Sequence, residues 1–148
     1  MAFLFSKPVL CERTSSKKGG GMNYEQLHNF LMQQQGAQLS HPFREDTAVY
    51  KVMDKMFALM FVKETQDGQS VHLNLKCDPD EALALRATYS NVVAGYHMSK
   101  KHWNTIIINQ FGEQEIPDTH IASMMRESYC LVFKGLTKVK QTQCLLLK

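Results

Sequence analysis

Residues 96–104 hold the densest group of side chains with binding chemistry in this sequence. The group comprises Tyr96, His97, Lys100, Lys101, His102, Trp103 and Asn104. Lysines bind phosphate and aromatic rings stack on bases, so interleaved groups of both kinds are typical of nucleic-acid-binding surfaces. This segment is therefore a candidate nucleic-acid-binding or ligand-binding loop.

The same segment has other interpretations. In one, Trp103 belongs to the core, the histidines make structural hydrogen bonds and the lysines lie in a solvated turn. In another, the segment lines a pocket for a small anion or contacts a protein partner. Asn74 and Lys76, on the polar face of a strand predicted over 70–77, extend the candidate surface. We expect Trp103 to be substantially buried, because the apolar run 106–108 follows it closely.

Cys77 is the one cysteine with a possible chemical role. It precedes Asp78, the expected cap of a helix, and His72 lies five residues before it, which allows a nucleophile–base pair. No third group or oxyanion hole accompanies the pair, and the acidic residues after Cys77 oppose thiolate formation. Packing is the favoured interpretation of Cys77, and we expect no catalytic residues.

Metal and cofactor sites are not expected. The histidines His97 and His102 are five residues apart, and no cluster supplies three or four ligands at familiar spacing. The four cysteines, at positions 11, 77, 130 and 144, include no CxxC pair, which favours reduced thiols in a cytoplasmic protein. Glycine-rich phosphate loops and the motifs GxSxG and HExxH are also missing from the sequence.

Charge is distributed unevenly along the 148 residues. Residues 1–21 carry four basic and one acidic side chain, and residues 134–148 carry four lysines and no acid. Residues 22–133 have 9 basic and 13 acidic side chains, a net charge of −4. A nucleic-acid-binding surface would therefore have to be local or lie near the chain ends. No apolar run approaches 18 residues, so we expect no membrane partner.

The hydrophobic pattern predicts one α+β domain. Helices are predicted over 23–35, from the Asp78-Pro79 cap onward, and from Pro117 onward. Strands are predicted over 47–53, 56–62, 70–77, 92–93 and 105–108. The order α-β-β-β-α-β-β-α favours a two-layer fold, in which helices pack on an antiparallel sheet. We expect a flexible extension over 1–21, a single domain over 22–134 and a basic tail over 135–148.

Five short motifs give the sequence a specific resemblance. They are Pro42–Thr47, Lys55–Leu59, Leu75–Pro79, Gly95–Thr105 and Glu127–Tyr129. In these motifs, and in their order, residues 22–134 resemble the MmcQ/YjbR family of small bacterial proteins. Two departures are Gln35-Gly36, where the family often has Pro-Gly, and Arg44, where it often has Gly.

The resemblance implies a fold and a function. The implied fold is an α-β(3)-α-β(2)-α domain related to secretion chaperones, which agrees with the predicted order of elements. The implied function is non-enzymatic DNA binding through a "double wing" arrangement of strands, here through residues 96–104 and the adjacent strands. The alternative is a protein-interaction or chaperone-like adaptor, which the chaperone-like fold permits by analogy.

Overall fold

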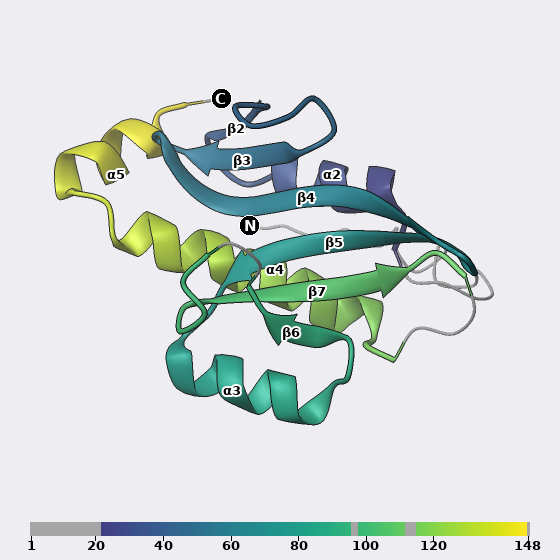
Figure 1. Cartoon of the computed structure of the whole chain (residues 1–148). Coiled ribbons are helices and arrows are strands. Elements are labelled where there is room, and N and C mark those ends of the chain that lie inside the picture. The colour runs from purple at the N-terminus through teal and green to yellow at the C-terminus, as the bar shows by residue number, and fades with distance from the viewer. Residues whose placement is uncertain (1–21, 96–97, 112–114, 148) are drawn as a thin grey trace.

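The structure is a computed structural model that describes residues 22–95, 98–111 and 115–147 (Figure 1). Its helices are α2 (Tyr24–Met32), α3 (Pro79–Thr88), α4 (Asp118–Lys134) and α5 (Lys138–Leu145). Its strands are β2 (Ala37–Ser40), β3 (Ala48–Val52), β4 (Lys55–Thr65), β5 (Gly68–Lys76), β6 (Val92–Ala94) and β7 (Trp103–Asn109). The predicted N-terminal extension, residues 1–21, lies outside the described residues.

The six strands form one antiparallel sheet in the order β2-β3-β4-β5-β7-β6. The predicted α+β class with an antiparallel sheet is thus confirmed. Two elements were not predicted, namely strand β2 and helix α5. Strand β2 exists because α2 ends at Met32 rather than at residue 35, and Gly36, with a φ of +74°, then turns the chain into an edge strand.

Local capping explains where the first helices begin. Asn23 and Gln26 form a reciprocal capping box at the start of α2. At α3 the side chain of Asp78 accepts hydrogen bonds from the backbone N–H groups of Asp80 and Glu81, and Pro79 occupies the first helical position. Both starts are close to those predicted, because capping signals are local in sequence.

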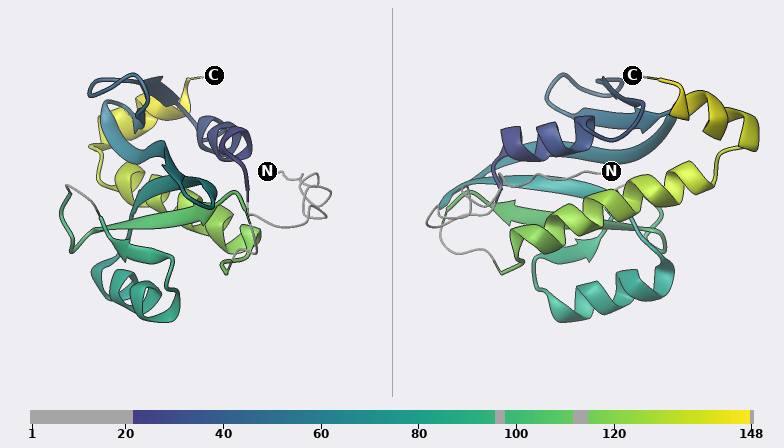
Figure 2. Two further views of the ribbon diagram at one scale, coloured as in Figure 1. Left: turned by 45° about the vertical axis from the view of Figure 1, so that its right-hand side comes forward. Right: turned by 180° about the vertical axis from the view of Figure 1, so that it is seen from behind.

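All the core-forming helices pack on one face of the sheet. Helix α4 packs across β4 and β5, in front of these strands in Figure 2, right, while α2 contacts β2 and α3 contacts β6 and β7. The buried side chains beneath them include Leu27, Tyr50, Leu73, Ile106, Ile121 and Met125. Figure 1 views the sheet from its other face, over which no described helix lies. No helix among the described residues is long and apolar enough to cross a membrane.

The C-terminal segment 135–148 was expected to be a tail, but it contains helix α5. The predicted domain limit at residue 134 is therefore corrected. The Thr137 side chain caps α5, and Cys144 is completely buried against the rest of the domain. The Cys144 thiol donates to the backbone carbonyl of Gln35 over 3.4 Å, and the Tyr129 hydroxyl donates to the same carbonyl over 2.7 Å. Burial of the apolar Cys144 therefore outweighs the polar character of the segment.

Candidate nucleic-acid interface

Alternation along the strands divides the sheet into two chemically different faces. In β5, Val71, Leu73 and Leu75 are buried beneath the helices, so His72 and Lys76 point to the opposite face. Antiparallel pairing carries this alternation to the neighbouring strands, since directly paired residues share a face. We call the surface without helices the open face.

The open face brings side chains from four strands together. It is formed centrally by Lys51, Leu59, Phe61, Lys63, Ser70, His72, Asn74, Lys76, Trp103, Thr105 and Ile107. No strand position on this face carries Asp or Glu within the described part of the chain. The face is therefore basic, although the folded domain with α5 included, residues 22–147, is nearly neutral, with 12 basic and 13 acidic side chains.

Three lysines lie on this face, on neighbouring strands. Lys63 is exposed, whereas Lys51 and Lys76 are half-buried. Two further exposed lysines, Lys100 and Lys101, lie in the turn that leads into β7. An ammonium group on a long stem can reach out of a half-buried position to a phosphate. The open face and the turn beside it thus offer at least five lysines among the described residues.

Aromatic rings lie between these lysines. Phe61 on β4 and His72 on β5 are paired directly and stack, with ring centroids 5.0 Å apart and an interplanar angle of 20°. Partial burial lowers the pKa of His72, and the positive charge of Lys63 lowers it further. His72 is consequently neutral at pH 7, and its ring is an uncharged partner for Phe61.

Trp103 lies on the open face, opposite Lys76, rather than in the core beneath the helices. Its side chain is half-buried, so the expectation of substantial burial is met only in part. Trp103→Ala should cost less than the roughly 3–5 kcal/mol typical of a core tryptophan, because water already reaches the ring. The ring keeps an accessible surface for a ligand.

Two amides of the predicted site are structural instead. Asn74 faces the predicted side but is 2% exposed, and its side-chain oxygen accepts a hydrogen bond from the Thr105 hydroxyl. Asn104 is also 2% exposed and lies on the helix-covered face, where it accepts a 2.7 Å hydrogen bond from Arg86 and donates to the Ala82 carbonyl. Neither amide is available to a ligand, because both are buried and bonded.

Three further residues of the predicted site, Lys100, Lys101 and His102, lie in the turn before β7. His102 is half-buried, and its backbone carbonyl accepts a 2.7 Å hydrogen bond from the N–H of Cys77. Arg86 on α3 donates to the backbone carbonyl of Lys100, which ties the turn to that helix. Tyr96 and His97 lie outside the described residues.

The absence of a side chain at Gly95 allows the backbone there to approach Trp103 closely. The Gly95 N–H donates to the Trp103 carbonyl over 2.9 Å. A Cβ atom at position 95 would lie 2.7 Å from the Trp103 Cβ and 3.0 Å from its backbone oxygen, which real Cβ contacts do not allow. The absent side chain of Gly95 thus determines the approach of the two chain segments.

Gly95→Ala should move the Trp103 ring and destabilise the β6–β7 pair, because neither backbone can give way easily. We expect a loss of about 1–3 kcal/mol, the range of an overpacking substitution. Trp103 is the only tryptophan in the chain, so its emission spectrum reports the displacement directly. Gly135→Ala is the matched control, since a Cβ there meets only ordinary contacts at 3.4 Å or more. An unchanged emission spectrum and melting temperature in Gly95→Ala would contradict this assignment.

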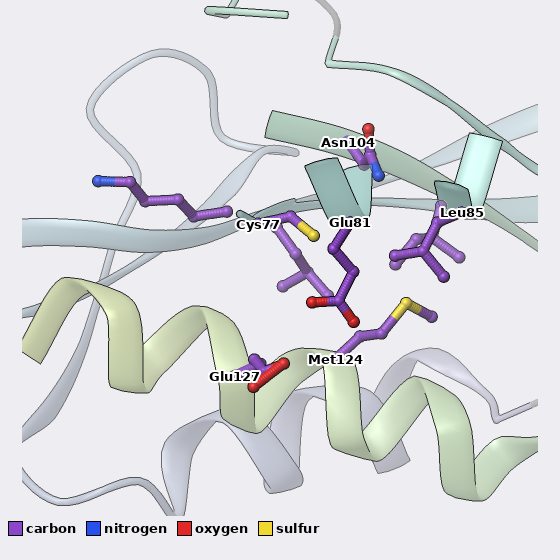
Figure 3. A pocket seen from close by; sticks show the side chains of 9 residues that line it. Cys77, Glu81, Leu85, Asn104, Met124 and Glu127 are labelled. Atoms are coloured by element: carbon purple, nitrogen blue, oxygen red, sulfur yellow. The ribbon is translucent and has the colours of Figure 1, made fainter. Parts of the chain in front are cut away.

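A separate hollow lies on the other face, between α3 and α4 (Figure 3). It has a volume of about 20 Å³, enough for about one water molecule. Glu81 from α3 and Glu127 from α4 lie beside Cys77 there (Figure 3). Burial raises the pKa of the Cys77 thiol to about 11, and the nearby carboxylates of Glu81, Glu127 and Asp78 contribute.

The hollow does not have the arrangement of a nucleophilic site. At neutral pH the Cys77 thiol stays protonated and is a weak nucleophile. His72, the base considered for it, points to the open face, so the sheet separates the two side chains. No group of three or more His, Cys, Asp or Glu in the described ranges could hold a metal ion.

Sequence reasoning missed Lys51, Phe61 and Lys63, because it placed the candidate surface on residues 96–104 and on one neighbouring strand. A usable signal was present for Phe61, since Leu59 and Phe61 alternate with the core residues Ala58 and Met60 of β4. Their importance follows only from the pairing of Phe61 with His72, which places β4 beside β5 in a defined register.

Comparisons with known proteins agree on one family. A family model described as YjbR matches residues 32–131. The chain is 32% identical over 105 residues to the uncharacterized protein YbdF of Escherichia coli O157:H7, covering 70% of this chain and 79% of that protein. It is 31% identical over 108 residues to the uncharacterized protein YjbR of Escherichia coli K12, covering 73% and 85%.

Two crystal structures have a similar fold. The Deinococcus radiodurans protein DR2400, with a domain described as DUF419, superimposes with a TM-score of 0.70 at 31% identity. The match covers 82% of this chain and 87% of that one. A Pseudomonas syringae protein superimposes with a TM-score of 0.63 at 24% identity, covering 74% and 98%, and supports the fold alone.

Proposed function

The chain belongs to the YjbR family, and on that premise we propose that it is a non-enzymatic nucleic-acid-binding protein that contacts DNA through its open face and the adjacent turn over 98–102. The observation that carries the proposal is the composition of the open face. Lysines and accessible aromatic rings lie together there, and the described strand positions of that face contribute no carboxylate. This combination suits phosphates and bases.

The distribution of charge explains how a nearly neutral domain can bind a polyanion. Helices contribute many of the carboxylates, including Glu25, Glu81, Asp118 and Glu127, and these helices cover the opposite face. The local potential at the open face, rather than the net charge, determines the attraction of a nucleic acid. The proposal therefore does not require a basic domain.

The lysines of the turn before β7 test the proposal. Lys100→Glu combined with Lys101→Glu should weaken DNA binding to every sequence alike, because both side chains are exposed and would bind phosphates rather than bases. The slope of log affinity against log salt should become shallower by about 0.9 for each duplex phosphate that the variant no longer binds. Fluorescence anisotropy of labelled DNA at several salt concentrations measures both quantities.

Circular dichroism should show that the double variant remains folded, since neither side chain is buried. Wild-type affinity no tighter at low salt than that of an ordinary neutral protein would eliminate the DNA-binding proposal. Binding that persists undiminished in the double variant would move the phosphate-binding role to other lysines, such as those of segment 134–148.

A protein-interaction function is the second candidate, favoured by the exposed apolar side chains at the C-terminal helix. Val139, Leu145 and Leu146 are 66%, 64% and 76% exposed. Exposed apolar groups that lie together suit a protein partner. Such a partner would bind independently of the open face, so charge reversal at Lys100 and Lys101 would leave that interaction intact.

A further inference from the structure

We infer that the open face binds single-stranded rather than duplex nucleic acid, with bases stacked on Trp103 and on the Phe61–His72 pair. The inference rests on the proposed function and narrows its ligand class. It depends on two features of the structure, the placement of the rings and the charge of the elements that could enter a groove.

The rings lie at two positions along the sheet. Trp103 is opposite Lys76, and Phe61 is opposite His72, four residues earlier on β5. At about 3.3 Å per residue, the two ring positions are roughly 13 Å apart along the strands. Ile107, half-buried and opposite His72, contributes apolar surface beside the second position.

Cations lie beside both ring positions. Lys76 is next to Trp103 across the β5–β7 pair. Lys63 follows Phe61 by two residues on the same face, near enough to His72 to lower its pKa. An unpaired strand can stack one base on Trp103 and another on an outer ring face of the Phe61–His72 pair, whose inner faces are turned toward each other, while its phosphates meet the lysines. In a duplex the base faces are already stacked on one another and cannot reach these rings.

Three elements of the right size for a DNA groove have acidic ends, whereas α5 and the turn between β6 and β7 carry exposed lysines. The preference for single strands therefore rests first on the rings. The major groove admits a helix or a two-stranded ribbon. The β4–β5 hairpin is such a ribbon, but Glu64 and Asp67 lie near its tip. Helix α3 has Asp80 and Glu81 in its first turn, and α4 begins with Asp118. Phosphates would repel each of these ends, because like charges oppose close approach.

The first experiment compares three labelled probes by fluorescence anisotropy. They are oligo-dT and oligo-rU of about 20 nucleotides, longer than the roughly 4–16 that one single-strand-binding module covers, and a mixed duplex of equal length. We expect at least tenfold tighter binding of a single-stranded probe than of the duplex. Comparison of oligo-dT with oligo-rU distinguishes DNA from RNA. Emission of the sole tryptophan, Trp103, should be quenched by the single-stranded probe.

Ring substitutions form the second experiment. Phe61→Leu and Trp103→Leu should each lower single-strand affinity roughly tenfold, the effect of removing one stacked base, with the salt slope unchanged. Trp103→Phe should restore most of the affinity, because it keeps a ring. Phe43→Leu is the matched control, since Phe43 is 67% exposed in the loop between β2 and β3, outside the strands β4, β5 and β7 that carry the rings. Circular dichroism establishes that each variant is folded.

The outcomes separate the two proposals. Equal, salt-dependent binding of duplex and single strands, with both ring variants neutral, would overturn the inference and leave the proposed function standing. Binding of none of the probes would overturn both. If Trp103→Leu were misfolded, Phe61→Leu together with the quenching of wild-type emission would still decide the question.

Discussion

Lys63→Glu combined with Lys76→Glu is expected to lower the affinity for single-stranded DNA by roughly 25-fold at about 0.1 M salt. Each phosphate of a single strand that a lysine binds contributes about 0.7 to the salt slope, or roughly fivefold in affinity at that concentration. The slope should therefore fall by about 1.4. The two lysines lie beside the aromatic rings of the open face, so reversing their charge places repulsion where phosphates would pass.

Lys138→Glu combined with Lys140→Glu is the matched control for this prediction. These lysines are exposed on α5, so the control changes the net charge equally without altering the open face. Salt-dependent anisotropy titrations of both double variants make the comparison. If the two pairs weakened binding equally, long-range charge rather than a defined surface would explain the affinity.

Ser128→Ala should lower the free energy of unfolding by about 2–4 kcal/mol, a large effect for the removal of one hydroxyl. Ser128 lies on α4 and is completely buried. Its hydroxyl accepts a 2.8 Å hydrogen bond from the Lys76 N–H and donates a 2.6 Å hydrogen bond to the Phe57 carbonyl. Alanine would leave the buried Phe57 carbonyl and the part-buried Lys76 N–H unpaired, at about 1–3 kcal/mol for the first and less for the second.

The geometry of β4 explains why the Ser128 side chain bonds to the backbone at Phe57. The β3–β4 register shifts by one residue, so that Tyr50 pairs with Ala58 and Lys51 with Met56, which leaves Phe57 as the extra residue of a bulge. The β4–β5 ladder begins only at the Ala58–Leu75 pair. Ser128 therefore supplies bonds that the two strands do not make to each other at this end.

Urea unfolding followed by circular dichroism measures the free energy of unfolding of the wild type and of Ser128→Ala. Ser123→Ala is the matched control, because Ser123 is exposed on the same helix and alanine favours helix formation there. A decrease below about 0.5 kcal/mol in Ser128→Ala would show that the two backbone groups find other partners. A change equal to that of Ser123→Ala would show that helix propensity alone is responsible.

Much of the fold could be predicted from local patterns. Asn23 with Gln26, and Asp78 with Pro79, determine where α2 and α3 begin, because a cap involves only residues of the same turn. Alternating apolar residues indicated β5 and its polar face for the same reason. The family resemblance implied the order α-β(3)-α-β(2)-α, to which the structure adds strand β2 and helix α5.

The C-terminal helix shows where local patterns fail. Residues 134–148 carry four lysines and no acid, and this pattern led to the prediction of a basic tail. The segment folds because Cys144 meets Gly36 and the Gln35 carbonyl, more than 100 residues earlier in the chain. Contacts at that separation leave almost no trace in a local window of sequence.

The sequence by itself determined which residues can bind phosphates or bases, but only the tertiary structure decided which of them share a surface. Asn74 and Asn104 looked equivalent in the sequence, yet they lie on opposite faces, because a residue's face follows from strand register. The same register brings Phe61 beside His72 and places Trp103 opposite Lys76. Register depends on pairings between distant segments and on the face that the helices bury, and neither is encoded within one strand.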